Sequence, residues 1–337
     1  MPAADGTVDP VTAGASDWVC AHVFYDTGHD ALLAGCVQPL VAGLFADGLL
    51  HRYFFLRYWE GGPHVRLRLL PTGTEAAAEL RRRTAASVGA FLESSPAPDT
   101  VDRARYRELA GELAAMEGMP AHDRVLRSNN TVEFLPYRRE HEVYGHGTAM
   151  AATEEHFQES SELALALVAA GTTSQQRALI ALDLMLGVLA LCDDLRTQWV
   201  DSGQPLIPFA RGAEPADTEA HYRARREQLR ERALRVWRLA PEPAGATPQA
   251  HWLRSVRKLR DRLSGWEDSG AFTSERARTP LTQGPDLAVL PHPATTLTLL
   301  RCVHLANNRL GLTLDQENQL RFLAGRVVTD LSRTSAS

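Results

Sequence analysis

Hydrophobic and polar positions change their spacing several times between the start of the chain and Gly147. Runs rich in valine, tyrosine and phenylalanine predict β-strands, and glycine, proline and polar residues separate them. The predicted strands are Asp17–Tyr25, the two arms of a hairpin within Arg52–Pro71, and Thr131–Tyr137. Apolar residues at three- and four-residue spacing predict the intervening helices, which are Asp30–Leu50 with a break at Pro39, Thr74–Leu92 and Val101–Met116.

From Ala149 onward the apolar spacing is helical almost throughout. The predicted helices cover residues 149–170, 174–197, 218–239, 249–264, 294–309 and 313–330. Strands followed by a run of helices predict an α+β fold, with an N-terminal mixed sheet and flanking helices packed on a helical C-terminal half. We expect a disordered segment over 1–16 and one domain over 17–333. This domain divides into an α+β part at 17–147 and a mostly helical part at 148–333, with the site between them.

The hairpin gathers positive charge on one face of the predicted sheet. Its turn is Glu60-Gly61-Gly62-Pro63, and side chains alternate after it, so His64, Arg66 and Arg68 share a face. If the turn takes four residues, Arg57 faces Arg66 across the strands. Like charges opposed in this way destabilise a sheet by roughly 0.2–1 kcal/mol per pair. Arginine geometry suits carboxylate or phosphate, so the pattern favours an anion site over a solvated sheet face.

Composition narrows the class of protein. The chain has 337 residues, 44% of them hydrophobic and 23% charged, and a net charge of −5, which is typical of a globular protein rather than a nucleic-acid or membrane-surface binder. Its four cysteines are isolated, which predicts reduced thiols in a cytoplasmic protein. We find no signal peptide and no apolar run of about 18 residues, so no membrane association is expected.

Common catalytic and cofactor motifs are missing from the sequence. Neither GxxxxGK[ST] nor GxGxxG occurs, and GxSxG is absent, which argues against ordinary nucleotide-binding enzymes and against a hydrolase nucleophile elbow. His141, Glu142 and His146 lack the HExxH spacing of a zinc site. Asp193-Asp194 ends a predicted helix and is interpreted as a polar helix end rather than a metal site. No metal and no cofactor is therefore expected.

Two further segments concentrate polar residues. Tyr137–Gly145 (YRREHEVYG) lies between a strand and a helix, where an exposed loop is the simplest interpretation. In Leu297–Leu310 (LTLLRCVHLANNRL), a helix places Arg301, His304, Asn308 and the neighbouring Arg309 on one side. A histidine in an apolar helix is more often structural than catalytic. Two adjacent asparagines are poor helix formers, however, and favour a function.

Together, FFLRYWEGGPHVRLRL, YRREHEVYG and HLANNRLG resemble the C-terminal elimination domain of class I lantibiotic dehydratases, over about Trp18 to Val328. This domain also occurs alone as the thiopeptide-type bacteriocin biosynthesis domain. The resemblance implies a lyase that expels glutamate from glutamylated Ser or Thr of a precursor peptide, leaving dehydroalanine or dehydrobutyrine. It implies two partners: the precursor peptide, with its leader and core, and a separate glutamyl-tRNA-dependent glutamylating protein. No direct contact with nucleic acid is expected, and a homodimer is possible.

The resemblance also assigns residues. The family's paired arginines match Arg66 and Arg68, its third arginine matches Arg139, and its catalytic histidine matches His304. We expect His304 to act as acid and base and the three arginines to stabilise the enolate and the leaving carboxylates. The residues that we expect to bind substrate are Arg57, His64, Tyr144, Asn308 and Arg309.

The sequence also leaves other functions open. The family's usual Arg-Tyr-Gly-Gly reads Val143-Tyr144-Gly145-His146, which departs from the pattern just after Arg139. Thiopeptide pyridine synthases share the fold and join two dehydroalanines by a formal [4+2] cycloaddition, with loss of water and the leader peptide. A non-catalytic scaffold could instead bind a precursor peptide by strand addition at a sheet edge. An unrelated arginine-rich anion-binding domain is the remaining interpretation.

Overall fold

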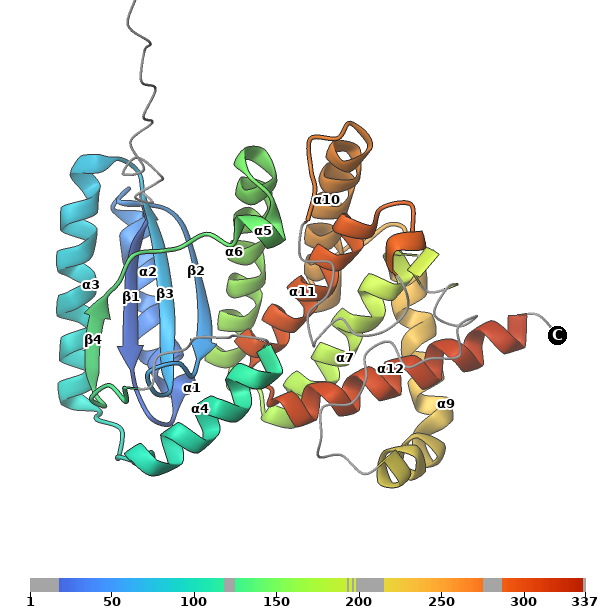
Figure 1. The fold of residues 1–337 in the computed structure, drawn as a ribbon, viewed down its shortest axis with the longest axis horizontal. Coiled ribbons are helices and arrows are strands. Elements are labelled where there is room, and N and C mark those ends of the chain that lie inside the picture. The colour runs from blue at the N-terminus through green and yellow to red at the C-terminus, as the bar shows by residue number, and fades with distance from the viewer. Residues whose placement is uncertain are drawn as a thin grey trace, which may run out of the picture.

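The sheet is small and lies in the N-terminal part of the chain (Figure 1). The computed structural model describes residues 18–117, 125–192, 194, 195, 197, 215–274 and 287–335, so the predicted disorder over 1–16 lies outside the described residues. The strands are β1 (Val19–Phe24), β2 (Leu50–Tyr58), β3 (His64–Pro71) and β4 (Thr131–Phe134), in the order β2-β3-β1-β4. All three pairings are antiparallel. The α+β class is confirmed, but the sheet is antiparallel rather than mixed.

The first part of the chain also contributes several helices. They begin with α1 (His29–Leu32), a π-helical turn (Leu33–Val37) and α2 (Gln38–Ala46), and continue with α3 (Thr74–Ser94) and α4 (Arg103–Glu117). In Figure 1, α2 lies behind the sheet and α3 beside it; α3 contacts β1, β3 and β4. Pro39 does not break the helix as predicted, because the backbone is helical from His29 to Ala46. The irregularity is instead the π-helical turn Leu33–Val37, which immediately precedes α2 and its Pro39.

Helix α6 joins the sheet to the helical part. After α5 (His141–Tyr144), α6 (Gly147–Ala169) contacts β2 on one side and α10 and α11 on the other (Figure 1). The remaining elements are α7 (Ser174–Leu191), α9 (Pro215–Leu239), α10 (Pro248–Asp268), a 3₁₀ turn (Leu287–Val289), α11 (Pro293–Leu310) and α12 (Leu314–Ser335). Five of the six helices predicted for this part match these bounds closely, whereas the helix predicted over 174–197 ends at Leu191, with Cys192 as its C-cap.

Two stretches are long and apolar enough, by composition alone, to cross a membrane. They are His29–Ala46 and Ser174–Leu191, although the sequence analysis expected none. Over half of the second stretch, 56%, is buried in the protein, where α7 contacts α9, α10, α11 and α12. A helix at the centre of a helical core passes the same test, so these stretches are weak evidence for a membrane protein.

The hairpin has a longer loop than its sequence suggested. Tyr58 pairs with His64, so five residues separate the strands, and Arg57 pairs with Val65 instead of facing Arg66. The predicted Arg57–Arg66 juxtaposition is therefore wrong. Gly62 in this loop has φ +115°, a backbone conformation that favours glycine, and a Cβ there would stand 2.9 Å from the end of the Leu126 side chain, which would have to move.

Candidate active site

Arg66 and Arg68 lie on one face of β3, and the alternating residues on the other face, Val65, Leu67 and Leu69, are fully buried, as predicted. The Arg66 guanidinium is 3.4 Å from the centre of the Tyr58 ring, and its Nη2 is 3.1 Å from Oε2 of Glu60. Burial lowers the pKa of Arg66, although its neighbours Tyr58 and Glu60 act in the opposite direction. Arg66 is thus a cation held by an aromatic face and one carboxylate.

The side chain of His64 contacts Arg66 on the same strand and orients it. Its side chain is fully buried, Nδ1 is 2.8 Å from the carbonyl oxygen of Gly62, and Nε2 is 3.1 Å from Nε of Arg66. Because the guanidinium can only donate, Nε2 is the acceptor, and the proton is on Nδ1. Burial is the main reason that its pKa falls to about 3. His64 is therefore a neutral side chain that orients Arg66, with both ring nitrogens in use.

Arg68 and Arg139 lie against the same tyrosine ring. Their guanidinium carbons are 4.2 Å and 5.8 Å from the ring centre of Tyr137, and Arg68 is also 5.2 Å from that of Phe54. Arg139 forms a bidentate ion pair with Glu154 of α6, at 2.7 Å and 3.3 Å. Among the described residues, no carboxylate forms an ion pair with Arg68. The structure thus brings Arg68 and Arg139 together through Tyr137.

His22 is a neighbour of both hairpin arginines that the sequence analysis missed. On β1 it pairs directly with Arg66 of β3, and its ring stacks on that of His64, with centres 5.0 Å apart. Burial first, and then the charges of Arg66, His64 and Arg68, lower its pKa to about 2. The available signal was the alternation of the predicted first strand, which places Cys20, His22 and Phe24 on one face.

Arg57 lies on the opposite face of the sheet. Its Nη2 is 2.6 Å from Oδ1 of Asp30 in α1, and Arg177 of α7 binds the other oxygen of Asp30 at 2.7 Å. Burial would raise the pKa of Asp30, but the two arginines outweigh it and the pKa is lowered. This cluster ties β2, α1 and α7 together on the face away from Arg66 and Arg68.

Asn308 and Arg309 bind the outer edge of β2. Asn308 Oδ1 accepts from the Arg57 amide at 2.9 Å, and its Nδ2 donates to the Arg57 carbonyl at 2.7 Å. Nε of Arg309 donates to the carbonyl of Phe55 at 3.0 Å, and the amide of Phe55 donates to Ser161 of α6 at 3.2 Å. These side chains replace a neighbouring strand, so the edge is satisfied over residues 55 and 57.

Arg309 and Tyr144 are interior residues. Arg309 is fully buried, and its guanidinium is 5.1 Å from the ring centre of Phe157; burial lowers its pKa to about 10. The Tyr144 ring packs edge-on against Phe157, with centres 5.3 Å apart, and burial raises its pKa. Both were predicted to bind substrate, and both lie between α6 and α11 instead of on an open face.

His304 lies at the contact between α11 and α12. Its Nδ1 is 2.8 Å from Oε2 of Glu317, whose other oxygen accepts from Arg321. At 3.6 residues per turn, His304 points about 140° away from Arg309 around the α11 axis. Its ion-pair partner Glu317 is thus on the helical side, while Arg66, Arg68 and Arg139 lie against the tyrosine rings beside the sheet.

With this geometry in place, comparison with known proteins identifies the family. The family model described as "Lantibiotic biosynthesis dehydratase C-term" matches residues 18–328. The chain belongs to this family. Membership places it in the biosynthesis of ribosomally synthesised and post-translationally modified peptides and supports an enzymatic role. A search of curated proteins gives no match.

Solved structures share the fold of this family member at low identity. The pyridine synthase TbtD from thiomuracin biosynthesis is 24% identical with a TM-score of 0.71, over 94% of this chain and 99% of that one. TsrL is 18% identical with a TM-score of 0.60, over 94% and 95%. The tRNA-dependent lantibiotic dehydratase MibB from Microbispora sp. 107891 is 18% identical with a TM-score of 0.56. That match covers 98% of this chain but 29% of MibB.

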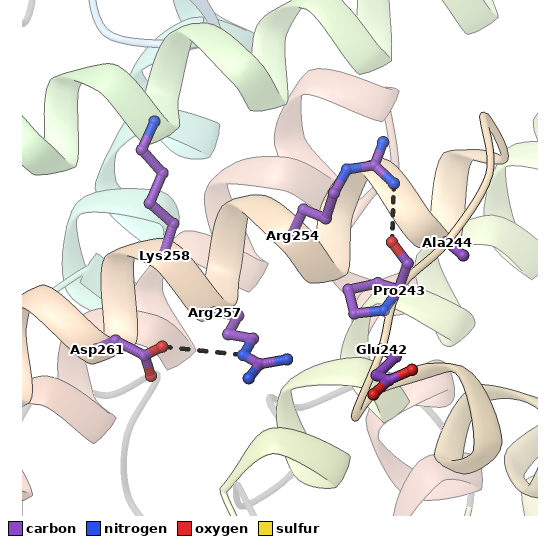
Figure 2. Close-up of a pocket in the computed structure, with 7 residues that line it drawn as sticks. All are labelled: Glu242, Pro243, Ala244, Arg254, Arg257, Lys258 and Asp261. Atoms are coloured by element: carbon purple, nitrogen blue, oxygen red, sulfur yellow. Dashed lines mark hydrogen bonds and ion pairs between the residues drawn. The ribbon is translucent and has the colours of Figure 1, made fainter.

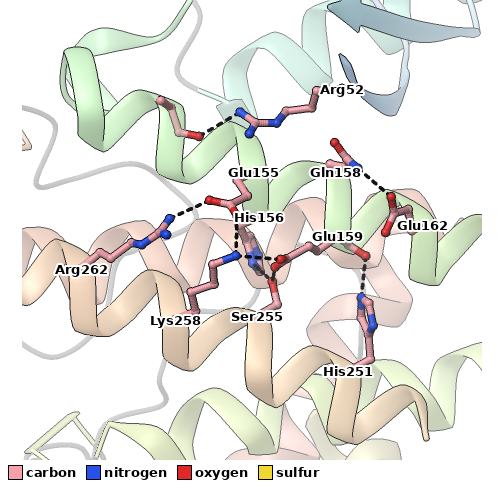
Figure 3. A network of polar contacts seen from close by, with 11 residues as sticks. Arg52, Glu155, His156, Gln158, Glu159, Glu162, His251, Ser255, Lys258 and Arg262 are labelled. Carbon is pink, nitrogen blue, oxygen red and sulfur yellow. Dashed lines mark hydrogen bonds and ion pairs between the residues drawn. The ribbon is translucent and has the colours of Figure 1, made fainter. Parts of the chain in front are cut away.

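A second polar cluster in this family member fixes α6 on α10 (Figure 3). Nδ1 of His156 is 2.7 Å from Oγ of Ser255, which donates to Glu159, and Lys258 binds Glu159 at 3.3 Å. His156 is buried, which lowers its pKa to about 3. Because Glu154, the partner of Arg139, is also on α6, this cluster holds the helix that positions the third arginine.

The basic residues of α10 also line a surface hollow of about 500 Å³ (Figure 2). Arg254 donates to the carbonyls of Pro243 and Gly245 at 3.0 Å and 2.9 Å, and Arg257 lies 3.9 Å from Asp261. None of the predicted site residues lines this hollow. Its cations are engaged within the protein, so the hollow is not a second candidate active site.

Proposed function

We propose that this family member is the elimination half of a split peptide dehydratase, which expels glutamate from glutamylated Ser or Thr in a precursor peptide. The observation that carries the proposal is the grouping of Arg66, Arg68 and Arg139 against Tyr58 and Tyr137, with Arg68 free of a carboxylate ion pair among the described residues. Guanidinium groups match carboxylates in geometry and charge. This grouping supports a site for an acidic leaving group.

The reaction needs charge stabilisation at two places. A base removes the α-proton, the C–H electron pair forms the Cα=Cβ bond, and the Cβ–O bond breaks as its pair leaves with glutamate. Arg66, Arg68 and Arg139 would stabilise the enolate oxygen and the departing carboxylates. The resemblance assigns proton transfer to His304, which would need access to the peptide from its position beside Glu317.

The test uses a purified precursor peptide that already carries glutamate on one serine. Mass spectrometry should show loss of glutamate with the unmodified protein. Arg68→Gln should slow this loss about 100- to 1,000-fold, the usual cost of one charge-stabilising donor. Arg52→Gln is the matched control on the same hairpin, because Arg52 binds the carbonyl of Ala151 and is not one of the three arginines. His304→Ala should abolish turnover; normal turnover would remove His304 from the mechanism.

A pyridine synthase is the second candidate function, and the comparisons favour it at one point. The match spans nearly all of TbtD, with a TM-score of 0.71 against 0.56 for MibB. A bis-dehydroalanine peptide distinguishes the two: a cyclase removes water and releases the leader, whereas an elimination enzyme leaves that peptide unchanged. Release of the leader by the unmodified protein, without loss of glutamate from the first peptide, would contradict our proposal.

The partners follow from the proposed reaction. The chain matches 29% of MibB. In our proposal a separate glutamyl-tRNA-dependent protein carries out glutamylation, and the precursor peptide is the shared substrate. A cytoplasmic location and a homodimer stay predictions. The scaffold alternative would need an edge other than residues 55 and 57 of β2, because side chains of α6 and α11 already occupy their backbone groups.

A further inference from the structure

We propose that His22 is an additional ligand for the carboxylate held by Arg66 and Arg68, and that it takes up a proton when this carboxylate binds. The inference rests on the proposed function, because it assumes that an acidic group enters this face of the sheet. It adds a residue that the sequence motifs did not single out.

The strand register places His22 between the two arginines. Arg66 is its direct partner on β3, and Arg68 and His64 are the diagonal neighbours on the same strand. Directly opposed side chains in a sheet have Cβ atoms about 4.5–5.5 Å apart, and diagonal ones about 7–8 Å apart. A carboxylate that spans the two guanidinium groups would therefore lie within reach of the His22 ring.

The His22 ring nitrogens are available to a ligand. His64 uses both of its nitrogens, on Gly62 and Arg66, whereas the described residues give His22 a stacking contact but no hydrogen bond. His22 is partly exposed. The His64 ring is thus held by hydrogen bonds within the protein, whereas the ring nitrogens of His22 can still bond to a ligand.

Binding an anion would change the charge around His22. The groups that face it are Arg66, Arg68 and His64 on β3, Cys20 on its own strand, and Glu133 on β4. The Glu133 carboxylate lies 3.7 Å from the Arg127 guanidinium. Burial opposes protonation of His22, and repulsion from Arg66, His64 and Arg68 opposes it further. A bound carboxylate neutralises this repulsion and accepts a hydrogen bond from the protonated ring, so binding and protonation favour each other.

The experiment measures binding of free L-glutamate, the expected leaving group, by calorimetry in two buffers of different ionisation enthalpy. Between about pH 4 and pH 6.5 we expect uptake of up to about one proton per site. The affinity should rise as the pH falls through the pKa of the His22 ring in the complex, by at most about tenfold per unit. His22→Gln should bind glutamate without this proton uptake. His51→Gln, on an exposed residue of β2, should behave like the unmodified protein.

The outcomes separate this inference from the proposed function. Three results would overturn the role of His22, even if the enzyme eliminates glutamate. They are no glutamate binding, no proton uptake by the unmodified protein, and proton uptake that is retained in His22→Gln. Proton-coupled binding without elimination would overturn the proposed function alone. If His22→Gln does not fold, the assigned imidazole resonance of His22 in the unmodified protein decides: glutamate must raise the lowered pKa of this ring.

Discussion

Replacing Asn308 by alanine tests whether the late asparagine–arginine motif is structural. The change removes the two hydrogen bonds, at 2.9 Å and 2.7 Å, that hold the Arg57 backbone. Each bond contributes about 1 kcal/mol net, and a half-buried backbone group left without a partner costs about 1–3 kcal/mol. Alanine returns up to about 0.7 kcal/mol in helix propensity. We expect the free energy of unfolding to fall by about 2–4 kcal/mol.

Urea unfolding followed by circular dichroism measures this loss directly. The midpoint should fall while the slope stays constant, because the same surface is exposed on unfolding. Gln175→Ala is the control, an amide-to-alanine change at an exposed position in α7, and should leave the midpoint nearly unchanged. An unchanged midpoint for Asn308→Ala, together with lost activity on glutamylated peptide, would refute the structural role and restore Asn308 as a substrate ligand.

Two other changes probe the contacts around β2. Arg309→Met leaves the Phe55 carbonyl without its donor, so we expect the free energy of unfolding in urea to fall by about 1–3 kcal/mol; normal stability with weak peptide binding would contradict this. Asp30 has a lowered pKa in the folded protein, so its stabilising contribution is present above pH about 4 and is lost as the pH falls through the folded value. Asp30→Asn should therefore lower the urea midpoint at neutral pH, and the difference from the unmodified protein should shrink near pH 3.

The order of the elements could be predicted because each has a strong periodic signal. The predicted helix over 294–309 is α11 (Pro293–Leu310), and the alternation after the turn correctly placed Arg66 and Arg68 on one face. Loop length was harder to predict, because Glu60-Gly61-Gly62-Pro63 is compatible with four or five residues. One extra residue moves every partner of β2 to the opposite face, which is why the position of Arg57 was wrong.

Partners distant in sequence explain the rest of the difference. Nothing near Asn308 indicates that it binds the backbone of Arg57, and the buried face of α6 gives no hint that Glu154 pairs with Arg139. A carboxylate within an apolar helical stripe was the one available signal for Glu154. Motif resemblance identifies residue types that recur together, but it does not distinguish a side chain that contacts substrate from one that holds an edge strand.

The three proposed anion-binding arginines differ in how strongly the protein already balances their charge. Glu154, which is buried, neutralises Arg139 through two hydrogen bonds, and Glu60 binds Arg66 through one, whereas Arg68 has aromatic faces against it. An entering carboxylate would share Arg139 or Arg66 with a carboxylate of the protein, but no ion pair among the described residues competes for Arg68. Arg68 should therefore bind the anion first. Substitution of Arg68 should reduce glutamate affinity more than substitution of Arg139. Removal of Arg139 would instead leave the buried Glu154 carboxylate without its bidentate cation and weaken the fold.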